Sequence, residues 1–93
     1  MKTGKHTAFM LEFVEEYASG KMPRQFFDLD YSSYCIEHFS HMESENGKLA
    51  RKFADTIDAV YELASAQNLD DKAFRKKMKD ALRDFNDPYL YDL

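Results

Sequence analysis

The chain has 93 residues, enough for one domain, and a net charge of −4 from 17 acidic and 13 basic residues. Two prolines and three glycines are few, which favours long helices over a turn-rich β fold. No stretch approaches the ~20 apolar residues of a membrane span, and no signal-peptide pattern opens the chain. The single cysteine, Cys35, cannot form an internal disulfide, so we expect a cytoplasmic protein with no membrane contact.

The charge is uneven along the chain. Residues 1–47 carry four Lys or Arg against eight Asp or Glu, a net of −4, and residues 48–93 carry nine of each. This balance argues against a general nucleic-acid binder, which needs a basic excess to neutralise phosphates. The first half of the chain is therefore the acidic half.

A short polar segment, residues 1–6, is expected to be frayed. A first helix is predicted from Thr7 to Ser19, because its apolar residues fall on one stripe: Met10, Phe13, Val14 and Tyr17. Gly20 supplies the left-handed residue that commonly follows a helix end. Pro23 is placed to be the first residue of the second helix, where its missing N–H costs nothing.

Residues 23–43 carry apolar side chains that point to more than one side: Phe26, Phe27, Leu29, Tyr31, Tyr34, Cys35, Ile36, Phe39 and Met42. Either one long helix is covered on two faces, or two shorter helices break near residues 30–33. Ser32 and Ser33 favour caps and turns, so the break is slightly preferred. The sequence Ser-Glu-Asn-Gly at residues 44–47 is the clearest predicted loop.

The helix pattern from Lys48 to Gln67 is the one that the rest of the chain is expected to cover. Its apolar stripe recurs at helical spacing: Leu49, Phe53, Ile57, Val60, Tyr61 and Ala64. The opposite side is acidic, with Asp55, Asp58 and Glu62. Asn68 tolerates the left-handed conformation that ends a helix.

Asp70 is a good N-cap for the last helix, whose apolar stripe is Phe74, Met78, Ala81, Leu82 and Phe85. Residues 86–88, Asn-Asp-Pro, end that helix. The apolar tail, residues 87–93, either folds back or is exposed. Together the patterns predict an all-α fold: a single domain, residues 1–93, built as a compact bundle of four to five antiparallel helices with short loops.

The only grouping that resembles metal ligands is Cys35, His38 and His41. They are spaced three residues apart on a helix, so the outer two fan apart by about 120°, whereas a closed zinc site needs four ligands. Further ligands could come only from His6, Glu37 and Glu43. A nucleophilic Cys35 would need a base and an electropositive setting, and this region is acidic and apolar. We therefore expect no enzyme, no metal and no cofactor.

A basic strip lies within roughly 100° of arc on the last helix. It consists of Lys72, Arg75, Lys76, Lys79 and Arg83. Such a strip could contact phosphates, as in a small nucleic-acid-associated regulator. The solvated side of an amphipathic helix is the favoured interpretation, because no Trp, Gly-rich loop or base-reading motif accompanies the strip.

Two acidic rows are the more interesting feature. They are Glu12, Glu15 and Glu16 on the first helix and Asp55, Asp58 and Glu62 on the central one. Each row alone is typical of a solvated face. Together they could form one negative surface that attracts a basic partner protein by electrostatic steering, with Tyr31 and Tyr34 as anchors.

The order of features resembles that of the colicin D immunity-like family of small helical bacterial proteins. Residues 13–22, Phe-Val-Glu-Glu-Tyr-Ala-Ser-Gly-Lys-Met, with Phe26 after them, resemble the family's first helix, its Gly-Lys turn and the aromatic that opens its second helix. Residues 69–82 are similar to its acidic-capped last helix. The similarity covers about half the chain, and residues 30–47 and the tail depart from the pattern.

The resemblance implies a non-enzymatic bacterial immunity protein that binds and blocks a basic nuclease toxin through acidic surface residues. Two alternatives remain open. The basic strip could make the protein a nucleic-acid-associated regulator, or the apolar tail and the two-sided segment 26–42 could form a homodimer interface.

Overall fold

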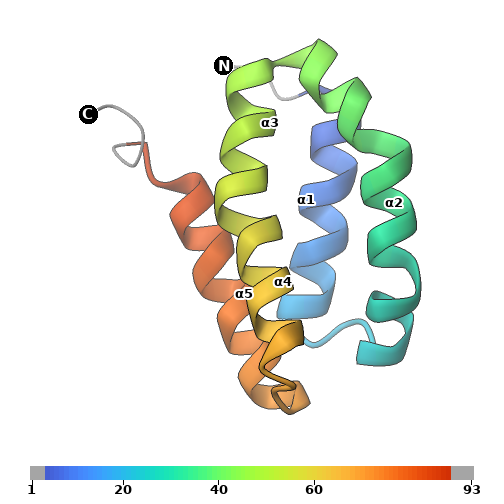
Figure 1. The fold of residues 1–93 in the computed structure, drawn as a ribbon, viewed down its shortest axis with the longest axis vertical. Coiled ribbons are helices and arrows are strands. Elements are labelled where there is room, and N and C mark those ends of the chain that lie inside the picture. Colours follow the sequence, from blue (N-terminus) through green and yellow to red (C-terminus); the bar gives the residue numbers. More distant parts are fainter. Residues whose placement is uncertain (1–3, 89–93) are drawn as a thin grey trace.

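Four helical rods form an antiparallel bundle in residues 4–88, the part of the chain that the computed structural model describes (Figure 1). In chain order the elements are α1 (Lys5–Ala18), α2 (Arg24–Glu45), α3 (Gly47–Phe53), the π-helical turn η1 (Ala54–Asp58), α4 (Ala59–Ala66) and α5 (Asp71–Asn86). α3, η1 and α4 follow one another without a break and form one central helix. The described residues contain no strand, so the predicted all-α bundle is confirmed.

Each of the four helical rods forms one corner of the bundle and packs against two neighbours. α1 packs on α2 and α5, and the central helix packs on the same two, so α1 and the central helix stand at opposite corners. None of the described helices is long and apolar enough to cross a membrane. The predicted behaviour of the tail falls on residues 89–93, which lie outside the described part of the chain.

An aromatic cluster fills the core between the helices. Phe27 on α2 is fully buried, and its ring lies 4.2 Å from that of Tyr17 and 5.2 Å from that of Phe13, centroid to centroid. The Phe74 ring on α5 is 6.4 Å away, edge-on. The predicted apolar stripes of α1 and α5 are buried throughout, and Phe53, Ile57 and Ala64 of the central helix are buried with them. Large rings therefore supply much of the buried area that this small chain needs.

α2 is one helix of 22 residues, so the preferred break near residues 30–33 is wrong. Both sides of the helix find partners: the Tyr34 ring packs edge-on against Phe13, and the Tyr31 hydroxyl donates to Asp58 on the central helix. This packing outweighs the weak preference of Ser32 and Ser33 for turns. The helix also begins one residue later than expected, with Pro23 as its cap residue.

The turn between α2 and the central helix is shorter than the predicted four-residue loop. Asn46 alone separates the two helices, and its side chain accepts hydrogen bonds from the amides of Lys48 (3.1 Å) and Leu49 (3.2 Å). At the other turns, Gly20 (φ 90°) and Asn68 (φ 54°) adopt the predicted left-handed conformation. The Asp70 carboxylate caps α5 by accepting from the Ala73 amide at 2.8 Å, as predicted.

The start of α1 is capped from α2, which the sequence pattern did not predict. The Glu45 carboxylate accepts hydrogen bonds from the His6 amide (2.7 Å), the Thr7 amide (3.0 Å) and the Thr7 hydroxyl (2.9 Å). Gly4 makes room for this carboxylate, because a Cβ at that position would collide with the Glu45 side chain. α1 therefore begins at Lys5, two residues before the expected Thr7.

Candidate functional site

The seam between α2 and the central helix is lined by carboxylates and tyrosines. The Tyr31 and Tyr61 rings stack with centroids 3.9 Å apart. The Tyr31 hydroxyl donates to Asp58 at 2.9 Å, and the Tyr61 hydroxyl donates to Asp28 at 3.4 Å. Glu62 is exposed one turn after Asp58. Asp28, Asp58 and Glu62 therefore gather along this one seam.

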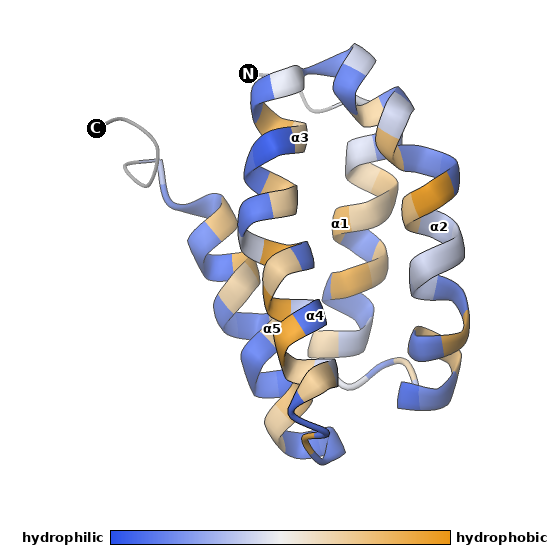
Figure 2. Cartoon of the chain, viewed as in Figure 1, coloured by the Kyte–Doolittle hydropathy of each residue, from blue (hydrophilic) through white to orange (hydrophobic). Residues whose placement is uncertain are grey.

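α2 also carries exposed apolar side chains. Leu29 is 72% exposed and Ile36 is 84% exposed. They are seven residues apart, so they lie on one side of the helix with an offset of about 20°. In Figure 2, orange bands of hydrophobic residues alternate with hydrophilic ones along the ribbon of α2. We call Asp28, Leu29, Ile36, Asp58 and Glu62 together the α2–α4 face.

The two acidic rows predicted from the sequence do not form one surface. Glu12, Glu15 and Glu16 are exposed on the side of α1 opposite its buried stripe. Asp55 and Glu62 are exposed on the outer side of the central helix, at the opposite corner of the bundle. The expected continuous surface is wrong, because the fold turns the two rows away from each other.

The two tyrosines predicted as interface anchors are differently placed. Tyr31 is 1% exposed and belongs to the core, so its role as an accessible anchor is wrong. Tyr34 is half-buried against α1, where its ring lies 5.0 Å from both Phe9 and Phe13. The side chains that could anchor a partner are instead Leu29 and Ile36, which are exposed on α2.

Cys35 lies in the same seam and is half-buried. Burial raises the pKa of its thiol to about 11, with a smaller rise from Asp58 and Glu62, although a hydrogen bond with Tyr31 opposes the shift. A thiol with so high a pKa is a poor nucleophile at neutral pH. Cys35 therefore packs as a small apolar residue in this site.

Three histidines meet where α1 begins. The Nδ1 atoms of His6 and His38 are 2.8 Å apart, and the His41 ring stacks on His6 with centroids 4.3 Å apart. The sequence placed His38 and His41 together with Cys35, but the structure groups them with His6 instead. Among residues 4–88, no group of three or more histidine, cysteine or carboxylate side chains is arranged to hold a metal ion.

These contacts change the acid–base behaviour of two groups. The pKa of His6 is lowered, mainly because partial burial disfavours the charged ring and secondly because His41 repels it. Burial alone would raise the pKa of Glu45, but the hydrogen bonds that it accepts from His6 and Thr7 lower it overall. Both shifts favour the state in which His6 is neutral and Glu45 is charged.

The basic strip of α5 lies along the seam with α1. Arg75 is held in place: it donates to Asp71 at 2.8 Å, to the Tyr17 carbonyl, and to the Met22 carbonyl at 2.9 Å. Its guanidinium also lies 4.3 Å above the Tyr17 ring. Arg75 is thus a structural link between α5, the end of α1 and the loop that follows it.

The other members of the strip differ in their partners. Lys76 donates to Asp80 at 2.8 Å, and Arg83 lies 3.5 Å from the same carboxylate. Lys72 and Lys79 form no ion pair with any residue that the structure describes. The strip is therefore partly neutralised, and its unmatched charge is concentrated at these two lysines.

Comparisons with protein-family models, with curated proteins and with solved structures find no match for this chain. The resemblance to colicin D immunity-like proteins therefore remains a prediction from the sequence pattern.

Proposed function

We propose that the protein is a non-enzymatic binding module that receives a basic partner protein on the α2–α4 face. The supporting observation is the exposure of Leu29 and Ile36 on α2, the helix whose seam with the central helix holds three carboxylates. Protein interfaces commonly combine apolar anchors that become fully buried with a polar rim. Burying one such side chain contributes roughly 1.5–3 kcal/mol of favourable free energy, so burial of both would contribute substantially to the binding of a partner.

The charges of the face select the kind of partner. Asp28, Asp58 and Glu62 belong to the same face as the apolar pair. Among residues 4–88, the one cation that forms an ion pair with any of these carboxylates is Arg24, whose Nε lies 3.2 Å from Asp28. A second copy of the chain bound symmetrically through this face would place carboxylates against carboxylates, which is repulsive. A partner with Lys or Arg around an apolar recess fits both features.

The concrete form of this proposal follows from the family resemblance. An immunity protein would cover a nuclease toxin, with the carboxylates of the α2–α4 face occupying positions where the nuclease holds phosphates. Steering between opposite charges would speed the encounter of the two proteins. Burial of Leu29 and Ile36 would slow their separation.

The test is to capture the partner from a lysate of the source organism, identify it, and measure its affinity as a purified protein. Leu29→Ser/Ile36→Ser removes the apolar anchors without changing the charge. Because this loses roughly 3 kcal/mol of apolar burial, we expect Kd to rise by about 100-fold. Glu62→Lys should raise Kd by about tenfold, mainly through slower association.

A matched control is Glu12→Lys, which makes the same charge reversal at an exposed glutamate on the opposite corner. It should change Kd less than about twofold, since it lies outside the face. The proposal is refuted if the captured protein is not basic, if the serine variant binds it as well as wild type does, or if Glu12→Lys and Glu62→Lys weaken binding equally.

A further inference from the structure

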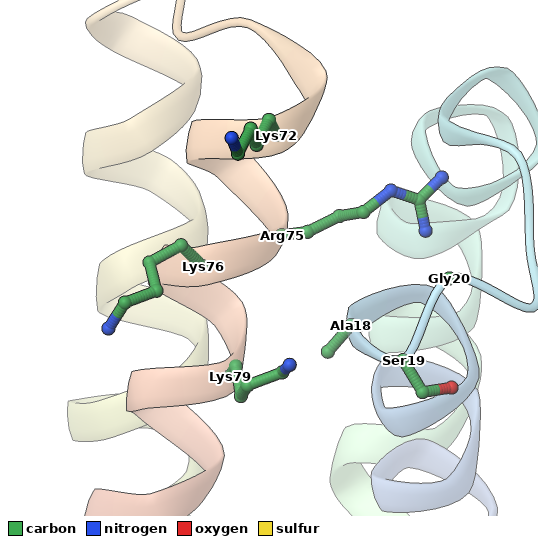
Figure 3. Close-up of a pocket in the computed structure, with 7 residues that line it drawn as sticks. All are labelled: Ala18, Ser19, Gly20, Lys72, Arg75, Lys76 and Lys79. Carbon is green, nitrogen blue, oxygen red and sulfur yellow. The ribbon is translucent and has the colours of Figure 1, made fainter.

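A cleft of about 310 Å³ opens between the C-terminal end of α1 and the first half of α5 (Figure 3). Residues 18–20 of α1 and the turn after it form one wall, and α5 contributes Lys72, Arg75, Lys76 and Lys79. In Figure 3, Lys79 extends toward Ala18, whereas Arg75 reaches past the cleft toward the loop after α1. The cleft is on the α1–α5 seam and shares no residue with the α2–α4 face.

The lining carries more positive than negative charge. Arg75 is matched by Asp71 and Lys76 by Asp80, whereas Lys72 and Lys79 have no carboxylate partner among the described residues. Lys72, Lys76 and Lys79 are spaced at four and three residues, so they rise from one side of α5 and their like charges repel one another. In Figure 3 Lys79 extends toward Ala18, whereas the ammonium groups of Lys72 and Lys76 do not. An anion placed between them would relieve that repulsion.

The surroundings strengthen this preference. Ala18, the stems of the lysines and the open surface at Gly20, where an added Cβ would meet no atom within 4 Å, give the cleft an apolar floor. The amides of Ser19 and Gly20 already donate to carbonyls of α1, so the lysines are the available donors.

We propose that this cleft binds a small phosphorylated molecule, with a phosphate held between Lys72 and Lys79 and the rest of the ligand lying on Ala18 and Gly20. Lysine acts on phosphate as a mobile point charge, and two lysines two helical turns apart can converge on one group or hold neighbouring phosphates. The site is independent of the proposed partner face, so either can fail without the other.

Two features of α1 place negative charge near the cleft, which disfavours an anion and suggests another role for the lysines. The carbonyls at the end of α1 carry partial negative charge, and α1 has no basic residue in its own last turn. The lysines of α5 could therefore serve only to complement the α1 dipole. Glu15, an exposed carboxylate one turn before Ser19, forms no ion pair with them but adds negative charge along the same helix.

The test is a titration of the whole protein, labelled with 15N, with inorganic pyrophosphate at fixed ionic strength. We expect saturable shifts at the Ser19 and Gly20 amides and along residues 72–79. Lys72→Gln/Lys79→Gln should weaken pyrophosphate binding at least tenfold. Lys48→Gln/Lys77→Gln removes the same charge from exposed lysines outside the cleft lining and should weaken binding less than twofold.

Four outcomes would overturn the proposal. Pyrophosphate could produce no saturable shift, or both double variants could weaken its binding equally, which would indicate only general charge attraction. The cleft variant could lower thermal stability in a protein that binds no pyrophosphate, which would assign the lysines to the α1 dipole. A single-stranded RNA oligonucleotide could bind more tightly than pyrophosphate and shift residues through Arg83, which would indicate a nucleic-acid surface.

Discussion

The packing of α2 can be tested with two neighbouring phenylalanines. Phe27 is fully buried among rings from α1, α4 and α5, whereas Phe26, the preceding residue, is 52% exposed. Replacing a buried Phe by Ala typically costs 3–5 kcal/mol, and the lost ring contacts place Phe27→Ala near the upper part of that range. We expect a loss of about 4 kcal/mol for Phe27→Ala and under about 1 kcal/mol for Phe26→Ala.

The measurement is equilibrium unfolding in urea, followed by far-ultraviolet circular dichroism. A folded chain of this size has a free energy of unfolding of roughly 5–14 kcal/mol, so Phe27→Ala should remain measurable if the wild type is not at the low end. The unfolding midpoint should shift while the slope stays constant for both variants. Equal losses, or a larger loss for Phe26→Ala, would show that α2 does not present the face described above.

Three further predictions concern pH, caps and the thiol. The fold lowers the pKa of His6 below 6.5, so the unfolded chain binds a proton before the folded chain does, and the urea concentration at the unfolding midpoint should decrease as the pH is lowered from about 7.5 to about 5.5. A second decrease should follow below about pH 4.5, where Glu45 becomes protonated. A midpoint that does not change with pH would contradict this prediction. Asn46→Ala and Asp70→Ala should each cost about 1 kcal/mol in the same assay, since each removes a helix cap, and a loss within error would contradict the capping geometry. Cys35, with a pKa of about 11, should react with iodoacetamide at neutral pH about a hundredfold more slowly than an unhindered thiol, whereas a rate like that of glutathione would contradict its burial.

The sequence predicts the helices well where one stripe faces one core. The stripe of α5 and the caps at Gly20, Asn68 and Asp70 are all found in the structure, because local spacing and backbone conformation determine them. It predicts α2 poorly, because this helix packs on both α1 and the central helix and has no single apolar stripe. The prediction there depended on Ser32 and Ser33, whose preference is weak next to tertiary packing.

Other features depend on contacts between residues far apart in the chain. The cap on α1 joins Glu45 to His6 across 39 residues and to Thr7 across 38 residues, so no local pattern could reveal it. The π-helical turn η1 falls within a regular apolar stripe, and no residue pattern in the sequence marks it.

The candidate site shows the same limit. The acidic residues and the apolar excess of α2 could be listed from the sequence. Their grouping could not, because the identity of neighbouring helices decides which rows share a surface. The fold therefore separates Glu12 from Glu62 and places Glu62 along the same seam as Asp28 and Asp58.

The most direct test of the central claim is a map of the surface that the partner covers. Spectra of the 15N-labelled protein would be recorded alone and with the purified basic partner. The proposal predicts shifts that gather at residues 28–36 and 58–62, with the amides of residues 12–16 unmoved. Shifts along residues 12–16 or along α5, with the α2–α4 face unmoved, would contradict it.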